Sequence, residues 1–307
     1  MHDLIILGGG IAGQSAAIYA ARKKMDYVLL AKELGGQYLQ SGEILNYPGI
    51  VKTSGAELYS AMLEQLRFNE VVAREGEEAR KVEKIEGGFR LTTDKGSYDA
   101  RTLIIATGAR PKKLKVPGEE SLRNKGVVYC AICDGPLFSG LDVAIVGGGN
   151  VALEAVEFMK DIAKRIYVLN KRNEFAAHVY LIENAKKLSN VEIIYEAKTK
   201  EIIGKDSVSG IVYEKNGKDH KLGVQAVIVS VGREPETEFL KGFVDLEEDG
   251  HVAIDCQTRT SVPGIFAAGD CASGHEYQYI IAAGQGCMAL LKAAKYLTAA
   301  AVSSHKK

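Results

Sequence analysis

The chain of 307 residues lacks several features that would assign it to a class at once. It has no net charge, since 39 Lys and Arg residues balance 39 Asp and Glu residues, and it has no tryptophan. A neutral chain with scattered cations has no field that would steer nucleic acid or an anionic membrane surface towards it. No apolar run approaches the roughly 20 residues of a transmembrane helix. We therefore expect a globular chain of about two domains that binds neither nucleic acid nor a membrane.

Cysteine is also scarce, with five residues of which only Cys130 and Cys133 are close in sequence. An odd number with one close pair is not typical of a secreted disulfide framework. The apolar run at residues 4–7 is too short for a signal peptide, so we expect a cytoplasmic protein. Cys287 lies four residues before Leu291, which predicts one shared buried helical face. The cysteines interpreted as packing residues are Cys256, Cys271 and Cys287.

Glycine, in contrast, is abundant, with 33 residues concentrated in short clusters between apolar runs. Two units read as strand, glycine turn and helix, one beginning near residue 4 and the other near residue 143. In such a turn the first glycine permits the bend, the second lets the main chain approach a pyrophosphate, and the third lets helix and strand pack. Each unit is predicted to bind a dinucleotide. The turn positions are Gly8, Gly10 and Gly13 in the first unit, and Gly147, Gly149, Asn150 and Ala152 in the second.

The residue at the end of each unit's second strand should discriminate between nucleotides, because a carboxylate there binds a ribose diol. Glu33 occupies this place in the first unit and is a candidate ribose ligand, although it can equally be a solvated surface residue. In the second unit the strand ends at Asn170, without an acid. Lys171 and Arg172 follow, and two cations can bind a ribose 2'-phosphate. This favours NADPH over NADH, with a solvated basic turn as the alternative.

Cys130 and Cys133 are separated by two residues, a spacing that can close a small disulfide ring. Disulfide exchange needs one thiolate to attack and another to resolve. A half zinc site is the alternative, but the six histidines show no ligand spacing, so no metal site is predicted. Asp134 follows directly. It can transfer protons to a leaving thiolate if partial burial raises its pKa, or it can be a turn residue before Gly135.

The order of apolar and glycine-rich segments predicts an α/β fold with two Rossmann-like, three-layer ββα domains. Linkers are expected near residues 112–118 and 232–240. A strand at residues 264–268 and a helix at about 278–297 would then complete the first domain. The second domain is therefore expected to be inserted in the first. The predicted domains are residues 1–112 with 240–307, and residues 113–239, which carry the cysteine pair.

These motifs resemble the low-molecular-weight, bacterial and archaeal type of thioredoxin reductase, from Leu4 to about Leu297. Beyond the glycine turns, the resemblance is carried by Gly35-Gly36-Gln37, Asn46-Tyr47-Pro48-Gly49, Ala106-Thr107-Gly108, Cys130 to Gly135, and Gly264 to Asp270 with Gln278. It implies that the first domain binds FAD and the inserted one NAD(P)H. The FAD contacts that it implies are Gly35, Gly36, Gln37, Asn46, Thr107, Gly108, Gly269, Asp270 and Gln278.

The resemblance also implies a route for the electrons. Hydride passes from a reduced nicotinamide to the flavin, which reduces the Cys130–Cys133 disulfide, with Cys133 nearer the isoalloxazine. Cys130 then attacks the disulfide of thioredoxin or a thioredoxin-like protein, and Asp134 is the acid and base. A homodimer is implied as well, and so is a rotation of the inserted domain about two linkers.

The sequence departs from this family where the electron donor would bind. Members that use NADPH usually show His-Arg-Arg and a further Arg, where this chain has Asn170, Lys171, Arg172 and Ala176. Lysine is a point charge that cannot give the bidentate grip of arginine, so NADH and reduced ferredoxin stay alternative donors. Tyr277 and Tyr279 flank Gln278 where Arg and Ala are common. Two rival functions are a flavin-dependent NADPH–ferredoxin reductase, which needs no cysteine pair, and a flavin-bound redox sensor.

Overall fold

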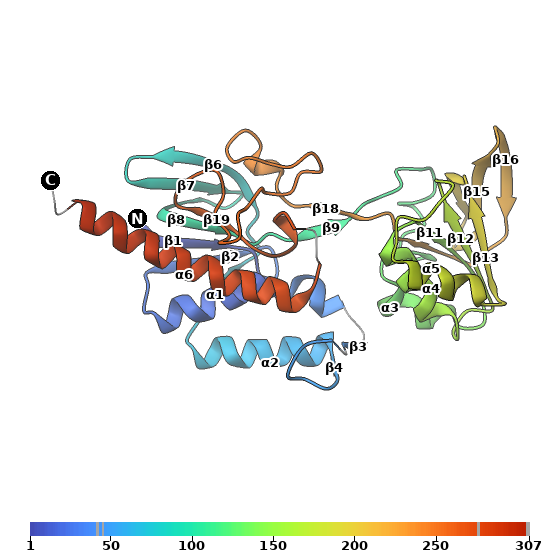
Figure 1. The fold of residues 1–307 in the computed structure, drawn as a ribbon, viewed down its shortest axis with the longest axis horizontal. Helices are drawn as coiled ribbons and strands as arrows, with labels where there is room; N and C mark the ends of the chain where they lie inside the picture. The colour runs from blue at the N-terminus through green and yellow to red at the C-terminus, as the bar shows by residue number, and fades with distance from the viewer. Residues whose placement is uncertain (41–42, 45, 275–276, 305–307) are drawn as a thin grey trace. The chain divides into compact units, whose positions relative to one another are not determined.

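The computed structural model describes residues 1–40, 43–44, 46–274 and 277–304, with only the backbone at residues 40, 43, 133 and 300–304. Contacts divide the chain into two compact units, Met1–Arg110 with Glu234–Lys307, and Pro111–Arg233. The chain crosses between them twice, at β9 (Ala109–Pro111) and β18 (Arg233–Pro235). These two strands pair with each other and run side by side in Figure 1. The second unit is therefore an insertion in the first.

The first unit is built on a sheet with β1 near its centre. In spatial order its strands are β5 (Ala73–Glu75), β2 (Tyr27–Ala31), β1 (His2–Leu7), β8 (Ser97–Ile105), β7 (Gly88–Thr93) and β6 (Ala79–Ile85), and β19 (Ile265–Ala267) also pairs with β8. The pairs are parallel except those of the β6–β7 hairpin. Leu4, Ile5 and Ile6 are completely buried, because both faces of the sheet are covered.

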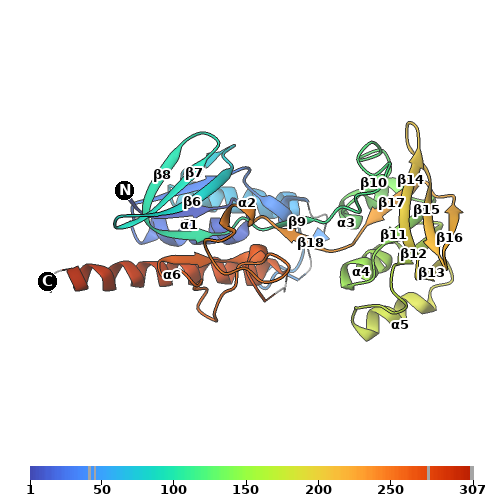
Figure 2. The ribbon, with the colours of Figure 1, turned by 90° about the horizontal axis from the view of Figure 1, so that it is seen from above.

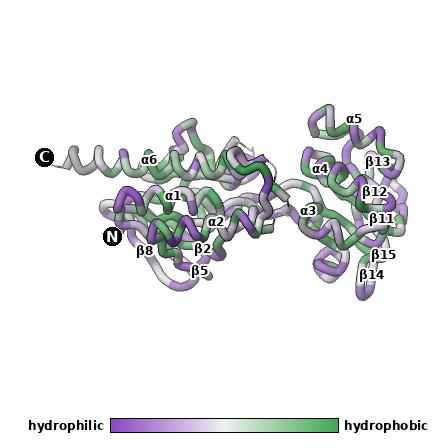
Figure 3. Tube along the Cα trace, turned by 90° about the horizontal axis from the view of Figure 1, so that it is seen from below, coloured by the Kyte–Doolittle hydropathy of each residue, from purple (hydrophilic) through white to green (hydrophobic). Residues whose placement is uncertain are grey.

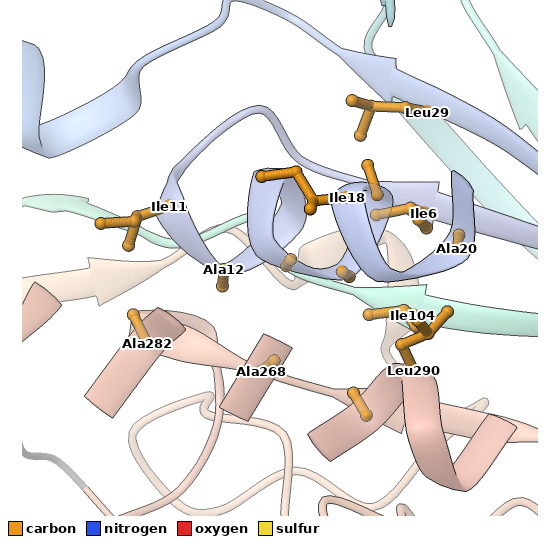
Figure 4. Packing of buried hydrophobic residues seen from close by; sticks show 14 of the residues in the cluster. Ile6, Ile11, Ala12, Ile18, Ala20, Leu29, Ile104, Ala268, Ala282 and Leu290 are labelled. Atoms are coloured by element: carbon orange, nitrogen blue, oxygen red, sulfur yellow. The ribbon is translucent and has the colours of Figure 1, made fainter. Parts of the chain in front are cut away.

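Helices cover one face of this sheet. They are α1 (Ile11–Arg22), α2 (Gly55–Phe68) and α6 (Tyr279–Ser304). In Figure 4, Ile18 of α1 and Leu290 of α6 lie in one core with Ile6 of the sheet. Figure 3 shows hydrophobic residues over much of α6. Within the described ranges, however, no helix is long and apolar enough to cross a membrane.

The opposite face is covered by the β6–β7 hairpin and by the segment that follows the second crossing. Leu240 and Val252 of this segment share a core with Leu103 of β8. The short elements of the unit are η1 (Gly36–Gln40), β3 (Glu43–Ile44), β4 (Thr53–Ser54), η3 (Glu238–Leu240) and η4 (Gly269–Cys271).

The second unit repeats this plan (Figure 2). Its parallel sheet has the order β10 (Val127–Val128), β17 (Ala226–Val229), β11 (Asp142–Val146), β12 (Arg165–Asn170) and β13 (Val191–Tyr195). One face packs on α3 (Ala131–Asp134), η2 (Gly135–Phe138), α4 (Asn150–Met159) and α5 (Val179–Lys187). The other packs on an antiparallel sheet of β14 (Lys198–Gly204), β15 (Val208–Lys215) and β16 (Lys218–Leu222). The predicted α/β fold class is thus confirmed.

The segments predicted as linkers are largely packed against one unit or the other. The buried Glu119 carboxylate accepts hydrogen bonds from the backbone N–H groups of Leu114 (2.8 Å) and Lys115 (2.6 Å) and from the Tyr129 hydroxyl (2.8 Å). After the second crossing, the Thr237 hydroxyl donates to the carbonyl of Gly250 (2.6 Å) within the first unit. The crossings are therefore the short paired strands β9 and β18.

Candidate flavin, nicotinamide and dithiol sites

The first glycine turn joins β1 to α1 and distinguishes two kinds of glycine. A Cβ added at Gly8 would lie 2.0 Å from the carbonyl oxygen of Ala106, and one at Gly13 would lie 1.9 Å from that of Gly8. A Cβ at Gly10 would meet nothing within 4 Å. The fold therefore requires Gly8 and Gly13, whereas Gly10 leaves an open cradle at the N-terminus of α1. Such a cradle fits the diphosphate of a dinucleotide, because helix N-terminal N–H groups and the helix dipole favour an anion.

The second turn, between β11 and α4, repeats the pattern. A Cβ added at Gly147 would lie 2.1 Å from the carbonyl oxygen of Ser230, whereas the nearest atom to one at Gly149 would be 3.7 Å away. Ala152 is completely buried and packs against Gly147, so the third position needs only a small residue. The Asn150 side chain accepts a hydrogen bond from the backbone N–H of His178 (2.8 Å). This bond holds the loop before α5 against the first turn of α4.

Several residues that the resemblance assigned to FAD gather around the N-terminus of α1. A Cβ added at Gly36, where φ is +57°, would lie 3.2 Å from the Cα of Gly10. Gly269 lies equally close to Ala12 of α1, since its added Cβ would be 3.1 Å from the Ala12 Cβ. Gly35 donates its N–H to the carbonyl of Gly9 (2.9 Å). These contacts bring three distant segments of the sequence to one cradle.

The other residues assigned to FAD make bonds within the first unit. The Gln37 side chain donates to the carbonyl of Ala109 (3.0 Å), and the Thr107 hydroxyl donates to that of Glu236 (2.7 Å). Asn46 Nδ2 donates to Gln278 Oε1 (3.1 Å). Gly108 has a φ of +73°, a left-handed conformation that favours glycine. The Glu33 side chain is exposed.

A cavity of about 180 Å³ opens beside these residues. Its walls come from η4, from the segment that follows η4 and from α6. Gly269, Asp270, Tyr277 and Gln285 are among the lining residues. Because Gly269 also packs on α1, the cavity adjoins the cradle at Gly10. The first unit therefore combines an open diphosphate cradle with an adjoining polar cavity, as a large dinucleotide requires.

Sequence patterns missed a polar brace beneath the first turn. Gln14 is completely buried, and its Nε2 donates to the carbonyl of Gly9 (2.8 Å) while its Oε1 accepts from the Tyr38 hydroxyl (2.8 Å). Burial raises the pKa of Tyr38 to about 12, so the phenol stays protonated and can donate. The available signal was one amide in the alanine-rich segment that forms α1.

At the second turn, Asn170 ends β12 and is 1% exposed. Its Nδ2 donates to the carbonyl of Glu174 (2.8 Å), and its Oδ1 accepts from the N–H of Arg172 (3.1 Å). These bonds shape the basic turn. The side chains of Lys171 and Arg172 are exposed, and no carboxylate occupies the end of β12.

The cysteine motif begins immediately before α3. Cys130 is partly exposed and disulfide-bonded, whereas the side chain of Cys133 lies outside the described residues. Gly135 has no room for a side chain, because its added Cβ would lie 2.5 Å from the Met159 Sδ of α4. Burial raises the pKa of the Asp134 carboxyl above its usual range. This carboxyl thus keeps its proton to a higher pH than an exposed aspartate does, as an acid in the exchange requires.

The remaining cysteines only partly match their predicted packing role. Cys256, Cys271 and Cys287 are all free, but only Cys271 is buried, and Cys256 is exposed. The predicted buried face around Cys287 is wrong, since Leu291 is 43% exposed. The helix α6 buries another face instead, which carries Ala282, Ala289, Leu290 and Ala293. Within the described residues, no cluster of His, Cys, Asp or Glu could hold a metal ion.

The chain belongs to the pyridine nucleotide-disulphide oxidoreductase family, which it matches over residues 2–287. It is therefore an FAD-dependent oxidoreductase that uses FAD and NAD(P)H. The open cradles at Gly10 and Gly149 fit these two cofactors.

The resemblance to the low-molecular-weight thioredoxin reductases is also confirmed. The structure of Lactococcus lactis thioredoxin reductase superposes with a TM-score of 0.86 at 31% identity, covering 97% of this chain and 99% of that one. In sequence, the chain is 40% identical over 299 residues to an alkyl hydroperoxide reductase of Staphylococcus aureus and 39% identical over 298 residues to an NADH dehydrogenase of Bacillus subtilis. Each match covers 96% of this chain but only 59% and 58% of those relatives.

Proposed function

We propose that the chain is a thioredoxin-disulfide reductase that passes electrons from NADPH through FAD to the Cys130–Cys133 pair. The disulfide-bonded Cys130 carries the proposal, because it lies in the same unit as the second dinucleotide turn and four residues before Asp134, whose carboxyl has a raised pKa. The similarity to a thioredoxin reductase along the whole length of both chains supports thioredoxin or a thioredoxin-like protein as the acceptor.

In this proposal the first unit binds FAD through its glycine turn and the residues gathered around it. The predicted FAD domain, residues 1–112 and 240–307, stays a prediction, as do the NAD(P) domain at residues 113–239, the homodimer and the cytoplasmic location. When bound, FAD accepts a hydride from the nicotinamide and passes an electron pair to a disulfide. The chain's own contribution is to hold the diphosphates at Gly10 and Gly149 and to manage the protons and sulfurs of the exchange.

The exchange runs through the two cysteines. The Cys130 thiolate attacks one sulfur of the acceptor disulfide, so that a Cys130–acceptor bond forms and the acceptor's S–S bond breaks. The protonated Asp134 gives its proton to the thiolate that leaves. The Cys133 thiolate then attacks Cys130, which restores the Cys130–Cys133 disulfide and releases the acceptor as a dithiol.

The raised pKa of Asp134 has a testable sign. Since the carboxyl stays protonated to a higher pH than usual, the acid step should slow as the pH rises through this raised pKa. We expect Asp134→Asn to lower the rate by about 10²-fold and to remove this limb of the pH profile. The measurement is single-turnover disulfide reduction by prereduced enzyme between about pH 4 and pH 8. Asp161→Asn, at an exposed carboxylate of the same unit, is the control, and an unchanged profile in Asp134→Asn would count against the role.

The donor is tested at the basic turn. A charge-assisted hydrogen bond contributes about 1.5–3 kcal/mol, so the double variant Lys171→Glu with Arg172→Glu should weaken NADPH binding by at least about tenfold and leave NADH binding unchanged. Anaerobic flavin reduction by each nucleotide measures this. A matched control reverses Lys186 and Lys187, two exposed cations in the last turn of α5.

NADH is the competing donor, because a relative named NADH dehydrogenase is 39% identical to this chain. Faster flavin reduction by NADH than by NADPH in the unaltered enzyme would favour this alternative. Reduction by reduced ferredoxin alone would exclude both nicotinamides as the donor.

A further inference from the structure

A buried histidine in the first unit connects a surface carboxylate to a tyrosine on the cavity wall. His251 is 1% exposed. Its Nδ1 lies 2.7 Å from Asp249 Oδ1, and its Nε2 lies 3.0 Å from the Tyr277 hydroxyl. The Asp249 side chain is 43% exposed. The electron transfer and disulfide exchange described above use none of these three residues.

The chemistry of the three groups fixes the direction of both hydrogen bonds. An ionised carboxylate only accepts, so the proton of a neutral imidazole must be on Nδ1, where it is donated to Asp249. Nε2 is then an acceptor, and the Tyr277 hydroxyl must donate to it. With its only proton committed to His251, the Tyr277 oxygen can present only lone pairs to other groups. The chain of bonds thus makes this phenol a fixed acceptor.

The backbone holds this arrangement against the cavity. Val252, next to His251, accepts a hydrogen bond from the Ser273 N–H at its carbonyl (2.9 Å) and donates its own N–H to the carbonyl of Cys271 (2.9 Å). Cys271 is the last residue of η4, which also contributes Gly269 and Asp270 to the cavity wall. Tyr277 lines the same wall. The three residues are therefore anchored to the segment that shapes the cavity beside Gly10.

We propose that Asp249 and His251 are positioning residues that hold the Tyr277 oxygen as a hydrogen-bond acceptor for a hydroxyl or N–H group of bound FAD. The proposal rests on the proposed flavin site in the first unit. An acceptor suits these parts of the cofactor and not its diphosphate, which also only accepts. Tyr277 touches the cofactor directly, whereas Asp249 and His251 act only through it.

The test is a double-mutant cycle on exposed or isosteric positions, since replacing the buried His251 can unfold the chain. The dissociation constant of FAD is measured by titrating apoprotein, together with the absorption spectrum of the bound flavin. We expect Tyr277→Phe to raise the dissociation constant about fivefold and to shift the flavin absorption bands. Asp249→Ala should have an effect of the same sign, and none when it is combined with Tyr277→Phe.

A matched control removes a hydroxyl from another tyrosine of the same unit. Tyr98 donates to Glu77 (2.9 Å), and Tyr98→Phe should leave FAD binding unchanged. The proposal is overturned if Tyr277→Phe leaves both readouts unchanged, or if Asp249→Ala keeps its full effect in the Tyr277→Phe background. Gly10→Asp separates the two levels: if that variant still binds FAD, the flavin site itself is wrong, whereas loss of FAD there with an inert Tyr277→Phe overturns only the relay.

Discussion

Cys130→Ser is expected to lower turnover with a disulfide acceptor by about 10³-fold or more while flavin reduction by the nicotinamide continues. A serine hydroxyl stays protonated at neutral pH and cannot form a disulfide, so both the attack and the return of the disulfide are lost. The two half-reactions are measured separately. Anaerobic stopped-flow absorbance follows the flavin, and thioredoxin in excess over enzyme reports turnover.

Cys256→Ser is the matched control for this experiment, because Cys256 is a free and exposed cysteine that is not part of the motif. It should leave turnover unchanged. The rival functions give different results. A flavin-dependent ferredoxin reductase would keep full turnover with ferredoxin in Cys130→Ser, and a redox sensor would reduce no more than one acceptor per enzyme even with the unaltered pair.

Gly10→Asp should abolish FAD binding without unfolding the chain. Gly10 is the N-cap of α1, and its added Cβ meets nothing within 4 Å, so an aspartate fits and is itself a favourable cap. Its carboxylate would, however, occupy the diphosphate cradle. Two like charges about 4 Å apart repel by about 4 kcal/mol near a protein surface, which corresponds to about 10³-fold in affinity. Flavin content after purification and a titration of the apoprotein measure the loss.

Two further variants make this result interpretable. Gly149→Asp places the same charge in the second unit and should remove nicotinamide binding while the flavin is retained. Gly13→Ala should instead destabilise the fold by about 3 kcal/mol or more, because its Cβ would lie 1.9 Å from the Gly8 carbonyl oxygen. Full flavin occupancy in Gly10→Asp would show that the cradle does not bind the diphosphate.

Local patterns predicted the fold class because strands, glycine turns and helices are encoded by neighbouring residues. The runs at residues 4–7 and 143–146 became β1 and β11, each leading into its glycine turn. The helix expected at about residues 278–297 is α6, which continues to Ser304. Periodicity did not identify the buried face of α6, since apolar residues such as Leu291 also lie on its exposed side.

The parts of the site that sequence did not predict depend on tertiary contacts between polar residues. Gln14 and Tyr38 are 24 residues apart, and His251 and Tyr277 are 26 apart, with no local spacing that connects either pair. Glu119 shows the same limit. Nothing in its neighbourhood distinguishes it from a surface glutamate, yet its carboxylate fixes the backbone of the segment predicted as a linker.

The pairing of β9 with β18 bears on how such a chain can be assembled from parts. The N–H of Lys112 donates to the carbonyl of Gly232 (2.9 Å), so the two ends of the inserted unit lie next to each other. A unit whose ends meet can be cut out and rejoined by a short loop, or replaced by another of the same plan, without opening the host's core. The insertion is thus an exchangeable cassette, and the host unit closed through a short turn from Arg110 to Glu234 can be expressed as a separate flavin-binding module.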